Sequence, residues 1–261
     1  MNKKIACSAF AVAAFAATAA HAVPMAGLTE EGLLVTFDSE AAAVQKMMPV
    51  TGIGGKLIGI DVRPSDSKLY AVATDNKIYT IDLMTGAATA VSTLSQAFPA
   101  SKAAVVDFNP AADRLRLMSS EGVSYRINVD TGAVTVDGNL KYDPADMSAG
   151  KTPMVTGGAY TNSFAGTKET ALYNIDAGTG ALVLQSPPND GVLKSKGMLG
   201  SAMTGMAALD IMSDGKGANM AYGASGKSVF TVNLETGVAG KAKPITGLTS
   251  NLIDIAVLPK M

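Results

Sequence analysis

The chain has 261 residues, of which 48% are hydrophobic, so a large domain can bury a sizeable core. Its 21 Lys and Arg residues nearly balance 22 Asp and Glu residues, and the net charge of −1 lacks the basic excess of most nucleic-acid-binding proteins. One Cys, one His and no Trp narrow the available chemistry further.

Residues 1–22 have the features of a secretory signal peptide. Lys3 and Lys4 precede an uncharged, Ala-rich run over residues 5–20, and Ala20-His21-Ala22 fits a signal-peptidase site. The run is short for a membrane span, and no stop-transfer segment follows it. We therefore expect a periplasmic or secreted protein that begins at Val23 and has no membrane association after cleavage.

Cleavage after Ala22 removes Cys7 and His21, which are the only Cys and His of the chain. Disulfides, thiol nucleophiles, Ser-His triads and zinc sites of imidazole or thiolate are then excluded. What remains is the chemistry of carboxylate, Lys, Tyr and Arg side chains, or calcium held by oxygen ligands. We expect no cofactor, with calcium as the one candidate ion.

A short pattern recurs along residues 23–261: an apolar residue, Asp or Asn, two variable residues, then Thr-Gly. The copies occupy residues 81–86, 127–132, 175–180 and 232–237, and residues 37–42 form a degenerate fifth copy. An aromatic residue or Val stands two positions before each apolar residue, which is the spacing of a strand with one buried face. The Thr-Gly pair fits a tight turn in which Gly supplies a positive φ.

A second recurring element reads as the first strand of each unit. Its aligned central positions, spaced 46, 52, 51 and 44 residues apart, are Asp61, Asp107, Ala159, Asp210 and Asp254. A full unit reads as four short strands, for example over residues 57–64, 68–75, 77–83 and 87–94. Units of about 40–50 residues with four strands each predict a β-propeller.

The two ends of the chain complement each other. Residues 25–50 match the second to fourth strands of a unit, and residues 252–259 supply only a first strand. The sequence therefore predicts one all-β domain over residues 23–261, a five-bladed β-propeller of four-stranded blades, closed by pairing of the N- and C-terminal strands. An open solenoid would not need complementary ends, and a β-sandwich with regular hairpins is the alternative fold.

Four stretches of sequence carry a family resemblance: residues 59–64 (GIDVRP), 106–134, 159–176 and 185–191 (QSPPNDG), with residues 111–128 the most specific part. Over about Gly27 to Pro259 the sequence resembles the secreted bacterial family catalogued as domain of unknown function 4394. The resemblance implies the fold and export. Because no activity is assigned to that family, it implies no functional residues.

The aligned carboxylates are the first candidate site, since the first strand of a propeller blade lies nearest the central channel. Asp61, Asp107, Asp210 and Asp254 at one level could hold calcium, which takes six to eight oxygen ligands, or could act as acid and base. The competing interpretation is that each buried carboxylate accepts hydrogen bonds from backbone donors of the adjacent blade. We favour the structural interpretation, and Ala159 interrupts the ring in any case.

The four Arg residues form a second candidate, because all lie in the first two full units: Arg63, Arg114, Arg116 and Arg126. Such clustering can mark a site for carboxylate or phosphate. The alternative, which we favour, is an Arg–Asp network between the first two blades, with Asp61, Asp107 or Asp113 as partners.

Two polar loops in the unit that lacks the aligned Asp form a third candidate. They contain Asn162 in residues 160–163, and Asn189 and Asp190 in residues 186–191. Loops on a rigid scaffold often bind ligands, but Pro-Pro-Asn-Asp-Gly is also an ordinary rigid turn.

Two functions of different class remain. The first is an exported, non-catalytic module that binds an unidentified protein, polymer or small molecule on one face. The alternative is a hydrolase or lyase that acts through channel carboxylates, with or without calcium, and needs two of them unpaired and about 5–10 Å apart. The shortage of catalytic residue types favours a binding module, which we expect to be monomeric, without catalytic residues and without affinity for nucleic acid.

Overall fold

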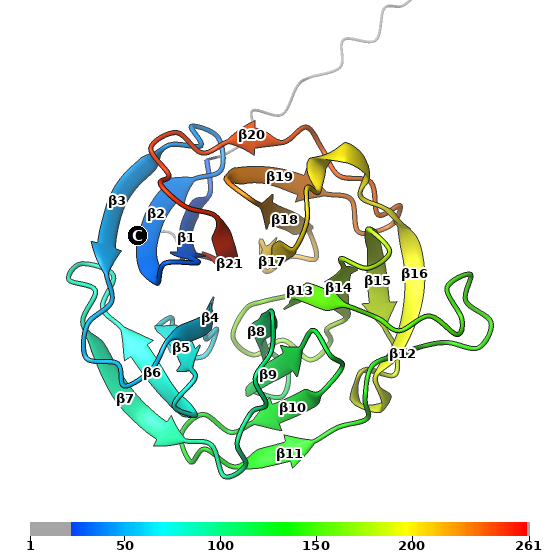
Figure 1. Cartoon of the computed structure of the whole chain (residues 1–261), viewed down its shortest axis with the longest axis horizontal. Helices are drawn as coiled ribbons and strands as arrows, with labels where there is room; N and C mark the ends of the chain where they lie inside the picture. Colours follow the sequence, from blue (N-terminus) through cyan, green and yellow to red (C-terminus); the bar gives the residue numbers. More distant parts are fainter. Residues whose placement is uncertain (1–21, 260–261) are drawn as a thin grey trace, which may run out of the picture.

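The computed structural model describes residues 22–259, so the predicted signal peptide lies outside the described residues except for Ala22. Five β-sheets stand in a ring around a central axis (Figure 1), which confirms the predicted five-bladed propeller. Apart from the single 3₁₀ turns η1 (Pro188–Asp190) and η2 (Gly200–Ala202), residues 22–259 form strands and connections. Neither turn has the length and hydropathy of a membrane span.

Blades 1 to 3 follow one another along the chain, and the first strand of each is innermost in Figure 1. Blade 1 consists of β4 (Leu57–Val62), β5 (Leu69–Ala73), β6 (Lys77–Ile81) and β7 (Ala88–Thr93). Blade 2 consists of β8 (Ala104–Asn109), β9 (Arg114–Ser119), β10 (Ser124–Ile127) and β11 (Val134–Val136). Blade 3 consists of β13 (Val155–Tyr160), β14 (Leu172–Asp176), β15 (Ala181–Gln185) and β16 (Val192–Met198), with β12 (Lys141–Tyr142) added parallel to β16.

Blades 4 and 5 complete the ring. Blade 4 consists of β17 (Ala207–Ser213), β18 (Asn219–Ser225), β19 (Ser228–Val232) and β20 (Lys243–Pro244). Blade 5 consists of β21 (Leu252–Val257), β1 (Pro24–Thr29), β2 (Leu33–Asp38) and β3 (Val44–Pro49). β21 pairs antiparallel with β1 in the register Ala26 to Ala256, so hydrogen bonds between the two ends of the described chain close the ring as predicted.

The hydrophobic core is divided among the five junctions between blades. Each junction has its own cluster of buried apolar side chains. Between blades 1 and 2, for example, the ring of Tyr70 meets that of Phe108 edge to face with centroids 5.3 Å apart, in the same cluster as the fully buried Leu115. Burial of such side chains stabilises each junction by about 1.5–3 kcal/mol per residue, so the ring is held together without any disulfide in residues 22–259.

The recurring Thr-Gly turns have the predicted geometry. Gly86, Gly132, Gly180 and Gly237 have φ between 71° and 75°, and Ala42 occupies the same position in the degenerate copy with φ 45°. In four blades this turn joins the third and fourth strands, but in blade 3 it joins β14 to β15. The reason is that residues 161–171 form a loop rather than a strand, so the strand before the turn pairs directly with β13.

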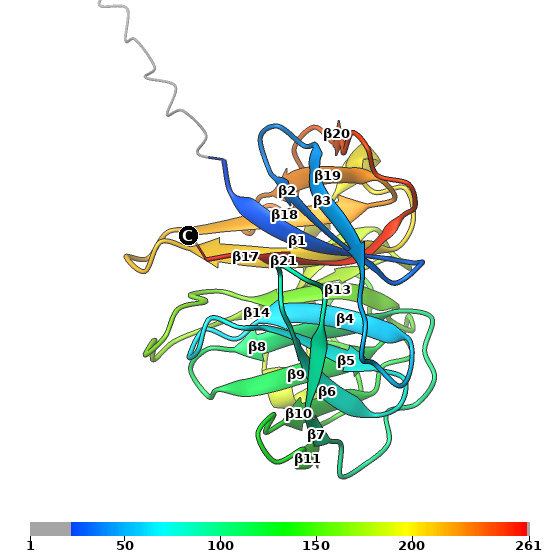
Figure 2. The same cartoon turned by 90° about the vertical axis from the view of Figure 1, so that its left-hand side faces the viewer.

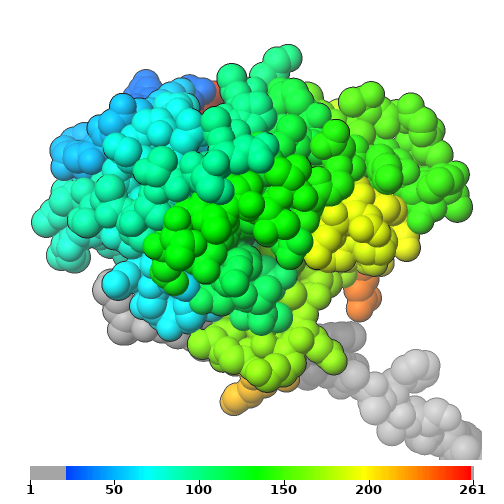
Figure 3. Space-filling view, turned by 90° about the horizontal axis from the view of Figure 1, so that it is seen from below, coloured from blue at the N-terminus to red at the C-terminus, as the bar shows by residue number. Residues whose placement is uncertain are grey.

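Several of these turns also fasten neighbouring blades at their outer edges. The Gly132 carbonyl accepts a hydrogen bond of 2.8 Å from Ser95 N–H, and a Cβ on Gly132 would overlap the carbonyl of Thr93 on β7. Gly86 approaches the carbonyl of Pro49 in the same way. Figure 3 shows the outer segments of blades 1, 2 and 3 side by side along the rim.

The direction of the inner strands defines the two faces of the ring. The inner strands β4, β8, β13, β17 and β21 all begin at one face, which is named the cavity face because a cavity opens there. They end at the opposite face, which is named the far face. The connections β13–β14 and β17–β18 project from the far face, on the left in Figure 2. They touch there through Asn162 N–H and the side-chain oxygen of Asn219 at 2.7 Å.

Candidate functional site

A cavity of about 800 Å³ opens at the cavity face, on the axis of the ring. The first residues of all five inner strands contribute to its wall: Leu57, Ile58, Ala104, Thr156, Ala207, Ala208, Leu252 and Ile253. Its mouth is formed by the connections that precede or flank these strands: Glu30, Lys56, Thr74, Asn76, residues 98–103, Thr204 to Met206, Ser225, Gly226 and Asn251. A space of this volume, apolar below and polar at the mouth, has the size and lining of a small-molecule site.

The mouth is held in shape by its own contacts. Phe98 N–H donates to the side-chain oxygen of Asn76 at 2.8 Å, and the Phe98 ring lies edge to face on Tyr125 with centroids 5.7 Å apart. In the neighbouring blade 5, the Glu30 carboxylate accepts from the side-chain amide of Asn251 at 3.3 Å. These contacts fix loops of blades 1 and 5 against the scaffold before any ligand enters.

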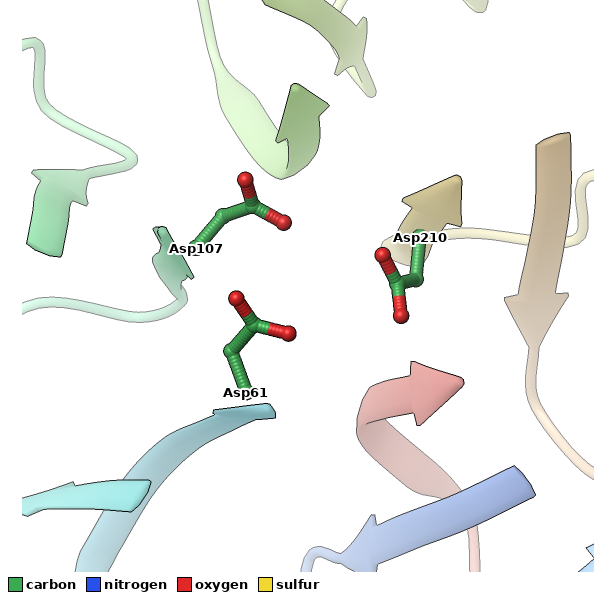
Figure 4. Close-up of side chains that lie close together, drawn as sticks. All are labelled: Asp61, Asp107 and Asp210. Carbon is green, nitrogen blue, oxygen red and sulfur yellow. The ribbon is translucent and has the colours of Figure 1, made fainter. Parts of the chain in front are cut away.

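Farther along the axis, three of the predicted carboxylates meet. Asp61, Asp107 and Asp210 point toward one another from β4, β8 and β17 (Figure 4), and one oxygen of each lies within 4.8 Å of the others. Three carboxylates at this separation are close enough to share a cation.

The expectation that Asp254 shares the level of the other three is wrong. Asp61 accepts from Phe108 N–H, one residue beyond the aligned Asp107. Asp210 instead accepts from Val257 N–H, three residues beyond Asp254, so β21 is displaced along the axis relative to β17. Asp254 consequently lies outside the group of three.

Each carboxylate joins its blade to the next one, as the structural interpretation predicts. Asp61 accepts from Phe108 N–H at 2.7 Å, and Asp254 accepts from Ile60 N–H at 2.8 Å. Asp210 accepts from Val257 N–H, and Asp107 accepts from Tyr160 N–H at 2.9 Å. The second oxygen of all except Asp107 also accepts from the following backbone N–H of its own strand.

The fifth junction, between blades 3 and 4, has a different fastening where Ala159 replaces the aligned Asp. The Thr156 hydroxyl donates to the Ala207 carbonyl at 2.9 Å and accepts from the N–H of the same residue at 3.1 Å. A Cβ on Gly157 would lie only 2.5 Å from that carbonyl, so glycine permits the close approach of the two strands. At this junction the Thr156 hydroxyl, together with the close approach of the two backbones, takes the place of the carboxylate.

Burial shifts the titration of all four carboxylates. Each is 5% exposed, and desolvation raises the pKa of Asp61, Asp107 and Asp254 well above its ordinary value. The charges of the neighbouring carboxylates raise the pKa of Asp61 and Asp107 further. Burial raises the pKa of Asp210 to about 6, against the opposing effect of its two backbone hydrogen bonds.

Arg63 forms the predicted network between blades 1 and 2. Its guanidinium binds Asp113 through two bonds of 2.8 and 2.6 Å, and it also contacts Asp130 at 2.9 Å. Because of these partners the pKa of Arg63 is raised and that of Asp113 is lowered. Asp113 is therefore the partner among the three carboxylates proposed, since Asp61 and Asp107 bind backbone N–H groups.

Arg116 connects different blades from those predicted. Its side chain, 1% exposed, donates to Tyr160 of blade 3 at 3.1 Å and to Asn189 of blade 3 at 2.9 Å. It also binds Asp137, which forms a two-bond pair with Arg126 at 2.7 and 2.9 Å. This network joins blades 2 and 3, because alternate residues of β9 face that junction.

The remaining sequence candidates lie apart from the cavity. Arg114 donates to the carbonyl of Asp113 at 2.8 Å. Asn162 contacts Asn219 at the far face, and the η1 turn with Asn189 and Asp190 packs on blade 2 through Gly138 N–H. Arg114 thus bonds within blade 2, whereas Asn162 and Asn189 take part in contacts between blades, and the predicted ligand role of these residues stays a prediction.

No motif in the sequence indicates the cavity. Its walls come from the ends of five repeats and from residues 98–103, none of which carries a recognisable motif. The sequence feature that could have indicated the cavity is a pair of lysines: Lys56 stands one residue before an inner strand, and Lys102 stands two residues before another. Only the ring geometry brings these segments together.

The family model described as "Domain of unknown function (DUF4394)" matches residues 33–256. No curated protein sequence matches the chain.

The solved structures that are similar to this chain include three from Bacteroides species. A protein of unknown function from Bacteroides caccae is 10% identical, with a TM-score of 0.46 over 85% of this chain and 73% of its own. An auxiliary nutrient binding protein from Bacteroides ovatus is 15% identical, with a TM-score of 0.48 over 84% of this chain and 58% of its own. A protein of unknown function from Bacteroides thetaiotaomicron is 14% identical, with a TM-score of 0.50 over 85% of this chain and 55% of its own. The similarity to the Bacteroides thetaiotaomicron protein is a similarity of fold alone. The chain spans less than two thirds of the length of the Bacteroides ovatus and Bacteroides thetaiotaomicron proteins.

Proposed function

The chain belongs to the family described as domain of unknown function DUF4394, and we propose that it is an exported, non-catalytic binding module whose ligand enters the cavity at the cavity face. The observation that carries this proposal is the cavity itself: about 800 Å³, placed on the axis, with walls from all five blades. A closed ring is a rigid scaffold, and preformed concave sites on such scaffolds are where small molecules bind.

The bonding of the axial carboxylates supports binding rather than hydrolysis. A carboxylate enzyme needs one carboxylate free to take a proton and another free to give one or to attack. Here both oxygens of Asp61 and of Asp210 accept backbone hydrogen bonds. Withdrawing either carboxylate for chemistry would leave buried N–H groups unsatisfied, at a cost of about 1–3 kcal/mol each.

Single-tryptophan fluorescence tests the proposal, because the chain has no Trp of its own. Phe98 lines the cavity, so Phe98→Trp places a reporter at its mouth. Titration with sugars, nucleotides, peptides and organic acids should yield ligands that change this emission and raise the melting temperature of the unmodified protein. A control reporter, Phe164→Trp, lies in the far-face loop of residues 161–171 and should not respond.

Two results would contradict the proposal. One is a panel in which no compound changes the Phe98→Trp emission or the melting temperature. The other is a ligand that changes the emission of the Phe164→Trp protein and not that of the Phe98→Trp protein, since binding would then occur at the far face.

We also propose that the protein acts outside the cytoplasm. The support is the sequence of residues 1–22, with its basic start, apolar run and Ala20-His21-Ala22 site. N-terminal sequencing of protein recovered from the periplasm or medium should begin at Val23. Recovery only from the cytosol with Met1 intact would show the export proposal to be wrong.

A further inference from the structure

We infer that the ligand of the cavity is an organic anion with an apolar body, its charged group at the mouth and its apolar part directed inward. This inference rests on the proposed function and adds the chemical class of the ligand. Three features of the cavity carry it: an apolar wall, two cations at one side of the mouth, and carboxylates deeper on the axis.

The wall of the cavity is apolar and offers few free hydrogen-bonding groups. Ile58, Ala104, Ala208 and Ile253 line it from four different inner strands. The hydroxyl of Thr156 is already bonded to both polar backbone groups of one residue of the next blade. A ligand body that lies against this wall gains from burial of apolar surface, at about 25 cal/mol per Å².

The mouth carries two cations without acidic partners. Lys56 precedes β4 and Lys102 precedes β8, so both ammonium groups belong to the side of the mouth formed by blades 1 and 2. Both residues are exposed, and among residues 22–259 neither forms an ion pair within 4.0 Å. The lining has one acidic residue, Glu30, which lies on blade 5 and is bonded to Asn251.

Carboxylates lie near the cavity at two places, one beside the mouth and one deeper on the axis. Beside the mouth, the Glu121 carboxylate is held by the hydroxyls of Ser101 and Ser120 at 2.6 and 2.9 Å and by the backbone N–H of Lys102 at 3.5 Å, and it does not line the cavity. Along the axis, Asp61 follows Leu57 by four residues, which is about 13 Å along a strand. Carboxylates at that depth offer an anion no cationic partner, so the charged group of a ligand stays at the mouth beside the lysines.

Two dyes that differ by one charge test the inference. 8-Anilinonaphthalene-1-sulfonate is an anion, and N-phenyl-1-naphthylamine has the same aromatic skeleton without the sulfonate. Their dissociation constants are measured by dye fluorescence on the full protein and by quenching in the Phe98→Trp protein. We expect the sulfonate to bind about tenfold more tightly than the neutral amine, because two exposed lysines each add an attraction to the sulfonate that solvent only partly screens.

Charge-matched variants locate the effect. Lys56→Gln with Lys102→Gln should weaken sulfonate binding about tenfold and leave binding of the neutral dye unchanged. The control pair, Lys216→Gln with Lys241→Gln, removes the same charge from exposed residues that do not line the cavity and should bind both dyes as the unmodified protein does.

The outcomes separate the two proposals. If both dyes quench the Phe98→Trp emission with equal affinity, and the lysine variants change nothing, the cavity binds ligands but the preference for anions is wrong. If neither dye binds, both the anion inference and the proposed binding cavity are contradicted.

Discussion

Asp107 on the inner strand of blade 2 accepts a hydrogen bond of 2.9 Å from the backbone N–H of Tyr160 on the inner strand of blade 3. The hydroxyl of the same tyrosine accepts from Arg116 at 3.1 Å, and Arg116 lies directly opposite Asp107 in the register of β8 and β9. Blade 2 therefore holds one residue of blade 3 at both its backbone and its side chain. The aligned aspartates and the clustered arginines, which are separate candidates in the sequence, belong to the same junction.

The stability contribution of such a carboxylate can be measured most cleanly at Asp254, which lies outside the group of three. Asp254→Ala leaves the N–H groups of Ile60 and Ile255 without their acceptors, so we expect the free energy of unfolding to fall by about 1–3 kcal/mol. Denaturant unfolding followed by circular dichroism gives this value.

Two comparisons make the Asp254 result interpretable. Asp254→Asn keeps one acceptor oxygen and should lose less stability than Asp254→Ala. Asp190→Ala removes an exposed carboxylate and should change the free energy of unfolding by less than about 0.5 kcal/mol. Equal stability of the Asp254→Ala and Asp190→Ala proteins would show that the bond to blade 1 contributes nothing.

The repeats allowed prediction of the number of blades, the closure by β21 and the positive φ of the turn glycines. Each of these depends on a local pattern: alternation along a strand, a Thr-Gly pair, and an Asp between apolar neighbours. The structural role of the aspartates followed for the same reason, because a carboxylate repeated in a buried strand needs donors from the neighbouring strand.

Other features depend on how the repeats are placed relative to one another. The axial displacement of β21 separates Asp254 from the other three, although the four align in sequence. The Thr-Gly turn of blade 3 moves to the β14–β15 connection because residues 161–171 form no strand. The cavity is formed by the ends of five strands, so no single segment of the sequence predicts it.

The contacts between blades at the outer edge predict that alanine substitution destabilises the protein by different amounts at two glycines of similar φ. Gly132 has φ 75° and Gly150 has φ 82°, so alanine at either position adopts a strained backbone conformation that costs about 1–2 kcal/mol. Only at Gly132 would the new Cβ overlap a neighbouring blade, at the carbonyl of Thr93, whereas nothing lies within 4 Å of a Cβ on Gly150. We expect Gly132→Ala to destabilise the protein by about 1–3 kcal/mol more than Gly150→Ala.

Thermal unfolding of the two glycine variants measures this difference. Equal melting temperatures would mean that the turn can move away from blade 1 without cost, and the proposed fastening at the outer edge would then be wrong.

The raised pKa values of the axial carboxylates predict that the protein is less stable at neutral than at mildly acidic pH. Burial raises the pKa of Asp210 to about 6 in the folded protein, against about 3.9 in an unfolded chain, so between these values the folded state binds more protons. The free energy of unfolding therefore falls as the pH rises from about 4 to 7, by up to about 1.4 kcal/mol per pH unit for one proton. Asp61, Asp107 and Asp254 shift in the same direction.

Melting temperatures between pH 4 and pH 8 test this expectation. Asp210→Asn removes one of the titrating groups and should flatten the dependence. Below about pH 4 the sign reverses, because carboxylates with lowered pKa, such as Asp113 and Asp146, lose their bonds on protonation. Stability that increases steadily from pH 5 to pH 8 would contradict the assignment.

The last prediction concerns calcium at the three converging carboxylates. Calcium takes six to eight oxygen ligands, but four of the six oxygens of Asp61, Asp107 and Asp210 accept hydrogen bonds from the following residue or the next blade, and a fifth accepts from Tyr160. Since these oxygens already serve the junctions, a chelator should leave the melting temperature of the protein unchanged, and added calcium should not raise it. A melting temperature that falls by several degrees in chelator and recovers with calcium would show that the carboxylates hold an ion. In that case Asp107→Asn should abolish the response to calcium, because Asp107 contributes the one oxygen of the three carboxylates that accepts no hydrogen bond from residues 22–259.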